Sequence, residues 1–192
     1  MANIQGSRSK SDMVRGIVIA GIVMTMSYGV IFVVNQQLMR QSANDPQVQM
    51  VEDYGNQLAS GSSLSIFNGL KMVDIEKSLA PYVMVYDDKK EMKFSSARLN
   101  AKIPEIPAEV LDSTRSHLEN RISWMPETGI RQAIVVRYFQ GNTNGFVVAG
   151  RSLREVELRE DILLKQMLSV WGVSILFIVI VELLVRKLIY RK

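Results

Sequence analysis

The chain has 192 residues, of which 47% are hydrophobic and 7% aromatic, a composition that excludes a disordered chain. It contains no cysteine, which excludes disulfides, thiolate zinc sites, iron–sulfur clusters and a cysteine nucleophile. Its formal net charge of +4 and its pI of about 9.4 would indicate nucleic-acid binding only if the positive charges gathered on the folded domain.

Two long apolar windows predict membrane-spanning helices. Residues 16–34 carry no charge, and residues 166–185 carry only Glu182. At about 1.5 Å per residue, helices of this length match a hydrocarbon core of roughly 30 Å. A cleaved signal peptide is the alternative for the first window. That run is longer than a signal region and lacks a small-x-small cleavage site, which favours an uncleaved anchor.

The positive charge is concentrated in two short tails. Residues 1–15 carry a net charge of +2 and residues 167–192 carry +3, whereas residues 16–166 carry −1. Lys and Arg are enriched in segments that flank a span on its cytoplasmic side. We therefore expect a two-pass protein of the cell (inner) membrane, with cytoplasmic tails at 1–15 and 186–192 and an extracytoplasmic centre at 35–165. A nucleic-acid partner is not expected.

Several side chains at the ends of the second window predict how it meets the membrane surface. Glu182 precedes Arg186 by four residues, a spacing that brings two side chains of a helix together. We expect an ion pair at the inner boundary, with a functional intramembrane carboxylate as the alternative. Trp171 near the outer end and Tyr190 near the inner end are expected in the interfacial aromatic belts.

Small residues recur every four positions in the first window, at Gly21, Thr25 and Gly29. Such a stripe lets two transmembrane helices approach closely, and it would permit self-association into a homodimer. Because glycine is common in membrane spans, a helix without such a partner is the alternative.

The segment that leaves the first window is expected to be helical. Residues 44–46 (Asn-Asp-Pro) predict a break in it, since proline cannot donate its amide inside a helix. Residues 61–63 predict a turn. A second short helix is expected to run from there to residue 79, given the spacing of Leu64, Phe67, Leu70 and Ile75.

After residue 79 the pattern of hydrophobic residues changes from helical spacing to compact runs that are typical of β-strands. Residues 82–86 and 92–96 flank a charged turn and predict a hairpin. A helix with proline in its first turn is expected at 107–119. Three further strands are expected at 121–125, 130–139 and 145–150. This order predicts an α+β fold with a five-stranded antiparallel sheet and helices on one side of it.

The order of these elements resembles the PAS-like extracytoplasmic modules, called single Cache or PDC domains, of bacterial sensor histidine kinases and chemoreceptors. The stretches that carry the resemblance are YVMVYDDKKEMKFSSARL and GIRQAIVVRYFQGNTNGFVVAGRSLREVELRE. The resemblance implies a sensor domain over residues 35–165, with its sheet core at about 82–151, between spans at 16–34 and 166–185. It implies no ligand class, because the amino-acid-binding Cache motif is absent.

A long helix is expected to leave the last strand. Ser152 and Glu155 have the spacing of a capping box, in which serine accepts from the amide of the glutamate and the glutamate reaches back. Neither Pro nor Gly follows Ser152 before Gly172, so a continuous helix of about 35–40 residues would join the sheet to the second span. We expect this junction to relay a signal. The charged face of the helix is either a solvated stalk or a dimer interface.

The resemblance also implies a small-molecule site between the sheet and its helical loop region. Aromatic rings could wall such a pocket, and arginine forks suit carboxylates and phosphates. The candidates are Tyr82, Tyr86, Arg98, Trp124, Arg131 and Arg151. The alternatives are that the aromatic residues belong to the core and that the arginines pair with acids of the domain.

The sequence yields no catalytic or metal-binding constellation. His117 is the only histidine, and no Ser/His/Asp set or phosphate loop can be assembled. We therefore expect no enzymatic activity, no metal and no cofactor.

These features favour a membrane-anchored sensor-like protein. It would bind a small ligand or partner and relay to a separate membrane protein, because it resembles the input half of a sensor kinase without output domains. The alternative is a non-catalytic accessory or structural subunit of a larger membrane complex, with the PAS-like domain as a docking surface. A third reading is a fragment of a longer receptor.

Overall fold

The computed structural model describes residues 2–42 and 44–189, with side chains from residue 14 to residue 188 except those of residues 43 and 186. The expected ion pair of Glu182 with Arg186 and the interfacial position of Tyr190 therefore fall outside the described residues. The chain divides into a helical unit, which holds residues up to Leu38 and from Arg159 onward, and a globular unit, Met39–Leu158.

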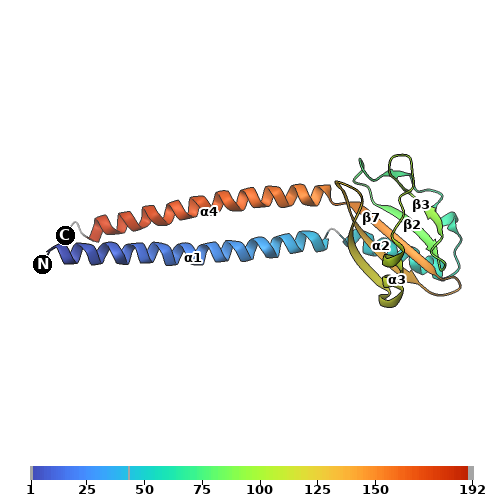
Figure 1. The fold of residues 1–192 in the computed structure, drawn as a ribbon, viewed down its shortest axis with the longest axis horizontal. Helices are drawn as coiled ribbons and strands as arrows, with labels where there is room; N and C mark the ends of the chain where they lie inside the picture. The colour runs from blue at the N-terminus through green and yellow to red at the C-terminus, as the bar shows by residue number, and fades with distance from the viewer. Residues whose placement is uncertain (1, 43, 190–192) are drawn as a thin grey trace. The chain divides into compact units, whose positions relative to one another are not determined.

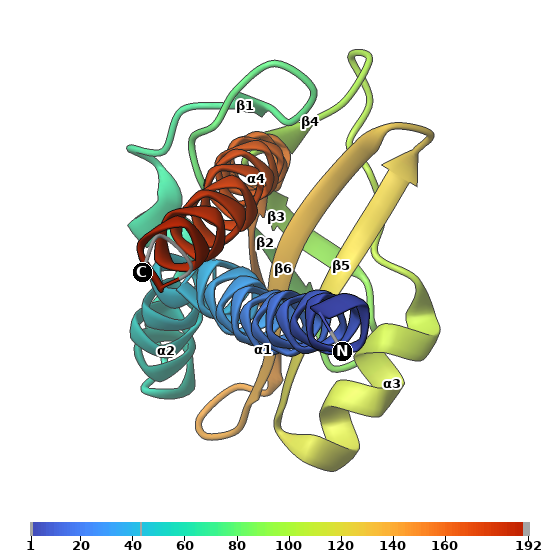
Figure 2. The same ribbon diagram turned by 90° about the vertical axis from the view of Figure 1, so that its left-hand side faces the viewer.

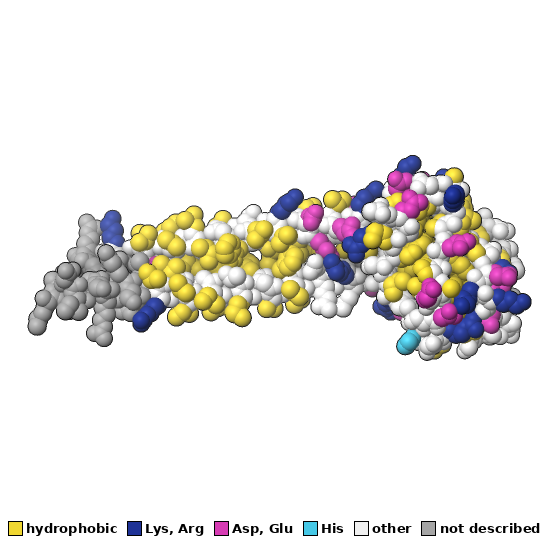
Figure 3. Space-filling model, in the orientation of Figure 1, with side chains coloured by type: hydrophobic (Ala, Val, Ile, Leu, Met, Phe, Trp, Pro, Cys, Tyr) yellow, Lys and Arg dark blue, Asp and Glu magenta, His cyan; other side chains and the backbone are white. Residues whose placement is uncertain are grey.

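Helices α1 (Ala2–Ser42) and α4 (Arg154–Ile189) supply the helical unit, where they lie side by side and antiparallel (Figure 1). Each contains a window long and apolar enough to cross a membrane, and neither window is buried within the structure. Many hydrophobic side chains lie on the surface of the described part of this unit (Figure 3), and the exposed fraction exceeds one half at Val18, Ile22, Leu168 and Leu176. The two predicted spans thus meet the length and composition of membrane helices, and their orientation stays a prediction.

The structure confirms the predicted helix break near residues 44–46 and the predicted long helix after the last strand. One helix ends at Ser42 and α2 (Asp45–Ala59) begins three residues later, with Pro46 in its first turn, where a missing amide hydrogen is tolerated. Helix α4 runs unbroken for 36 residues from the end of the sheet, as the exit helix was expected to do.

The globular unit is built on an antiparallel sheet with the strand order β3-β2-β7-β6-β5. Its strands are β2 (Tyr82–Asp87), β3 (Met92–Ser95), β5 (Glu119–Glu127), β6 (Ile130–Phe139) and β7 (Gly145–Ser152). Two short strands, β1 (Val73–Asp74) and β4 (Ala97–Arg98), form a separate parallel pair. The α+β class and the five-stranded antiparallel sheet are therefore confirmed.

Side-chain alternation along β2 divides the core into two layers. The even-numbered residues of β2 point to one face of the sheet, and Val83 and Val85 point to the other. Helix α2 packs on the Val83 face, whereas α3 (Ala108–His117) packs on the opposite face through Leu111, beside β5 and β6 (Figure 2). The prediction of helices on one side is wrong, because the central strands are apolar at both alternating positions and each face needs a cover.

The prediction of a helix between residues 64 and 79 is also wrong. The structure has a single 3-10 turn, η1 (Leu64–Phe67), followed by a loop and β1. Phe67 stacks on Phe94 on the α2 face, with 4.6 Å between ring centroids, whereas Ile75 is buried on the α3 face. One short helix cannot send these two residues to opposite faces of a sheet, so their helical spacing is accidental.

Candidate functional site

A groove of about 550 Å³ opens on the α3 face of the sheet. Strand β2 and the β2–β3 turn form one side, and the segment that enters α3 forms the other. The lining residues are Tyr86, Lys90, Glu91, Met92, Glu105, Ile106, Pro107, Ala108 and Leu111. The lining therefore combines apolar side chains with the charges of Lys90, Glu91 and Glu105, a composition that suits a small ligand with both apolar and polar parts.

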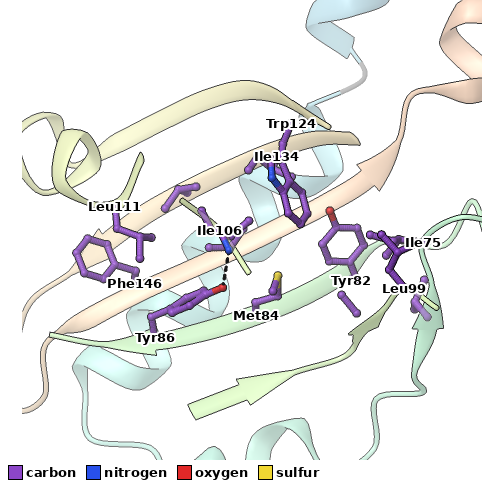
Figure 4. Close-up of a cluster of buried hydrophobic side chains, with 14 of the residues drawn as sticks. Ile75, Tyr82, Met84, Tyr86, Leu99, Ile106, Leu111, Trp124, Ile134 and Phe146 are labelled. Atoms are coloured by element: carbon purple, nitrogen blue, oxygen red, sulfur yellow. Dashed lines mark hydrogen bonds between the residues drawn. The ribbon is translucent and has the colours of Figure 1, made fainter. Parts of the chain in front are cut away.

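Tyr86 lies at the bottom of this groove and is only 3% exposed. Its hydroxyl oxygen accepts a hydrogen bond from the backbone amide of Ile106 at 3.1 Å, which fixes the loop before α3 to β2 (Figure 4). Burial raises the pKa of Tyr86 to about 12; the bond from Ile106 opposes this shift, and the charge of Glu105 adds to it. The hydroxyl is therefore protonated near neutral pH and keeps a hydrogen to donate.

Helix α3 is tied to the β2–β3 turn by charged side chains. Lys90 Nζ donates to Asp112 at 2.8 Å, and Arg115 pairs with Asp88 at 3.1 Å. The Arg115 guanidinium also lies 5.2 Å from the ring centroid of Tyr138, whose hydroxyl donates to Asp88 at 2.7 Å. This hydrogen bond raises the pKa of Tyr138. The two walls of the groove are thus joined at its rim.

The aromatic candidates all belong to one buried layer. Tyr82 and Trp124 are 1% and 8% exposed and share with Tyr86 the core on the α3 face (Figure 4). Of the three, only Tyr86 lines the groove.

The arginine candidates do not gather around that layer. Arg131 Nη1 lies 2.6 Å from Glu157, and Arg151 Nε donates to the carbonyl of Leu79 at 3.1 Å. Arg98 is exposed on β4. The structure brings none of these guanidinium groups to the groove.

The side chains of three residues hold a segment that the sequence did not single out, residues 75–79, here called the strap. Gln132 Nε2 donates to the carbonyl of Ile75 at 3.0 Å, and Arg154 Nη2 donates to that of Lys77 at 3.0 Å. Arg151 holds the last carbonyl of the strap. Because Arg154 is the first residue of α4, the strap is fastened to the start of the exit helix.

The predicted cap at this junction differs in its geometry. The Ser152 hydroxyl accepts from the amide of Arg154 at 3.3 Å, one residue earlier than in a capping box, because α4 begins at Arg154. Glu155 lies in the first turn of α4, where negative charge suits the positive end of the helix dipole.

The small-residue stripe of α1 meets α4 of the same chain. The Cα of Gly21 faces Ile175, and a Cβ there would lie 3.7 Å from its Cδ1. Thr25 accepts a hydrogen bond from Trp171, whereas a Cβ added at Gly29 would meet no atom within 4 Å from the described residues outside its own helix backbone and chain neighbours. Two residues of the stripe are therefore engaged within the helical unit.

Among the residues that the structure describes, no group of three or more His, Cys, Asp or Glu side chains is arranged to hold a metal ion. No protein-family model, no curated protein and no solved structure matches this chain.

Proposed function

We propose that this chain is a membrane-anchored, extracytoplasmic sensor-like protein. Its groove beside Tyr86 binds a small ligand, and its transmembrane helices relay the response to a separate membrane partner. The position of the groove carries the proposal. Strand β2, which supplies Tyr86 to the groove, pairs along its whole length with β7, from Tyr82 opposite Gly150 to Asp87 opposite Gly145. Strand β7 in turn leads directly into α4.

The strap offers a second route from the sheet to α4. It follows β1, which pairs with β4, and β4 begins the loop that runs to Ile106 at the groove. A ligand that displaces Ile106 from Tyr86 would move this loop, and the movement would reach Arg154 through the strap carbonyls. Such small displacements are amplified when packed elements have two discrete arrangements.

The membrane part of the proposal is supported by charge and by element order. Basic tails flank both apolar windows, and the hairpin, helix and three closing strands that carry the PAS-like resemblance stand in that order in the globular unit. The proposed topology places both tails in the cytoplasm and residues 35–165 outside it.

Ligand binding in the groove can be tested by filling it. The purified full chain in nanodiscs is screened for small molecules that raise its unfolding temperature. Ala108→Trp puts a large ring into the groove, whereas Glu109→Trp places the same ring on an adjacent exposed position that does not line it. We expect hits that stabilise the wild type and Glu109→Trp but not Ala108→Trp. Hits that act equally on all three proteins would place binding elsewhere.

The topology can be tested with single cysteines, because the natural chain has none. A membrane-impermeant maleimide should label Lys102→Cys in cells whose inner membrane is intact, and should label Lys187→Cys only after lysis. Labelling of Lys187→Cys in intact cells would contradict cytoplasmic tails.

A second candidate function is that of a non-catalytic accessory subunit that docks through the globular unit. It would dock through exposed apolar side chains of the globular unit, among which Met72, Ile103, Leu118 and Met125 are about half exposed. Copurification from mild detergent separates the two readings. A complex of fixed stoichiometry with another membrane protein favours the subunit, and a free homodimer favours the sensor.

A further inference from the structure

Two buried polar atoms on the α3 face have no hydrogen-bond partner among the described residues. They are the hydroxyl of Tyr82 and the Oε1 atom of Gln132, in side chains that are 1% and 0% exposed. Buried polar groups are almost always paired with protein or with an ordered molecule, so each such atom needs an explanation. Gln47 also has unpartnered atoms, but it lies in α2, which packs on the other face.

The sheet register brings the two side chains toward each other. Tyr82 lies opposite Gly150, and its ring covers that glycine so closely that an added Cβ would collide with the hydroxyl end of the ring. On its other side Gly150 pairs with Ile134, and Gln132 lies two residues further along the same strand and face. The Tyr82 hydroxyl therefore reaches across β7 toward β6, and Figure 4 shows it directed toward Trp124 and Ile134.

The unmet hydrogen-bonding capacities of the two groups are complementary. Gln132 Nε2 already donates to the carbonyl of Ile75, which fixes the amide and leaves Oε1 as an acceptor without a donor. Burial, with a smaller contribution from Tyr86, holds the pKa of Tyr82 well above its usual value, so its hydroxyl stays protonated. A molecule that accepts from Tyr82 and donates to Gln132 would satisfy both groups.

The surroundings select against a charged molecule. The nearby members of this layer are apolar and buried, among them Ile75, Leu99 and Trp124. An isolated charge in such a setting is strongly disfavoured, whereas one hydroxyl group both donates and accepts.

We propose that Tyr82 and Gln132 form an internal site for one uncharged, hydroxyl-bearing molecule, which is either a water molecule or a small alcohol or polyol. The site lies apart from the groove and does not depend on the proposed function. Leu99 and Ile106 cover this face of the core, so an occupant would enter when the loop between β4 and α3 moves away from the sheet.

The sign of a stability change tests the proposal. Tyr82→Phe removes the hydroxyl and keeps the ring. If the hydroxyl binds an occupant, the variant loses a satisfied hydrogen bond, and the folded-to-unfolded ratio should fall by about two- to tenfold. If the hydroxyl is merely desolvated, the ratio should stay the same or rise, which would overturn the site. The ratio is measured by urea unfolding of the full chain in nanodiscs. All proteins carry Trp171→Phe, so that the fluorescence of Trp124 alone reports unfolding of the globular unit. Tyr54→Phe is the matched control.

A measurement on the wild type covers the case in which the variant does not fold. Nuclear Overhauser effects between the ring hydrogens of Tyr82 and a long-lived water or added alcohol signal are expected, and their absence would count against any occupant. Saturable stabilisation by a diol series that is lost in Tyr82→Phe identifies an alcohol or polyol. A water signal without such stabilisation identifies water.

Discussion

The indole N–H of Trp171 in α4 donates a hydrogen bond to the hydroxyl of Thr25 in α1 at 2.9 Å. Thr25 passes its own hydrogen to the carbonyl of Gly21 at 2.7 Å, so the contact ends on the backbone of α1. A second polar contact, between Tyr28 and Ser174 at 3.2 Å, lies next to it. In an apolar environment such pairs hold helices together because lipid offers them no other partner.

Loss of the Trp171 hydrogen bond should weaken the pairing of α1 with α4. Trp171→Phe is expected to reduce the stability of the pair by about 0.6 kcal/mol, the usual size of such contacts between membrane helices. The measurement is the rate of disulfide formation between Gly21→Cys and Ile175→Cys, two positions that face each other in the structure. A weaker helix pair should form this disulfide more slowly. Leu176→Ala, on an exposed position, is the control. Equal rates in all backgrounds would show that the contact does not hold the helices.

Gly150 should not tolerate a side chain. In Gly150→Ala the methyl group would collide with the ring of Tyr82, which is buried and cannot turn out into solvent without opening the core. Overpacking of this kind destabilises by about 1–3 kcal/mol, and the urea midpoint should fall accordingly. Gly69→Ala is a matched control, because among the described residues none beyond its own chain neighbours has an atom within 4 Å of the added Cβ. Similar midpoints for both variants would mean that the ring can move aside.

The fold could be predicted where local pattern decides the structure. The turn signals around β6 and β7 and the uninterrupted residues after Ser152 gave the closing hairpin and the exit helix with nearly the observed bounds. The pattern failed between residues 64 and 79, where Phe67 and Ile75 serve different faces of the sheet. Which face a residue serves is decided by partners far away in the sequence.

The site was predictable to a smaller degree for the same reason. Tyr86 stood out as an aromatic residue in a β-type run, and it lines the groove. Arg154 and Gln132 could not be singled out, because their partners are backbone carbonyls 77 and 57 residues earlier. Every residue has such a carbonyl, so the sequence carries no mark of the strap.

Loosening the strap should be visible as local opening. Arg154→Met keeps an unbranched, flexible apolar stem but removes the donors to the carbonyls of Glu76 and Lys77. We expect faster amide hydrogen exchange in residues 75–82, because the free energy of their local opening should fall by about 1 kcal/mol. Exchange in β5 and β6 should change little. Arg121→Met, which breaks a surface pair with Glu119 on β5, is the control. Unchanged exchange in Arg154→Met would show that the strap is held by packing alone.

The stability of the globular unit should fall at high pH because Tyr86 is held protonated. Its pKa is raised from 10.0 in the unfolded chain to about 12 in the folded protein. The unfolded state therefore releases this proton first. The stabilisation is fully present below pH 10 and is lost as the pH rises from about 10 through 12, with a limiting slope of about 1.4 kcal/mol per pH unit.

Urea midpoints measured between pH 8 and pH 11 should fall less steeply in Tyr86→Phe, whereas the contribution of Tyr82, whose pKa is also raised, should persist. Parallel curves for the variant and the wild type would show that the Tyr86 hydroxyl reaches solvent and that the bond from Ile106 does not hold the loop on β2.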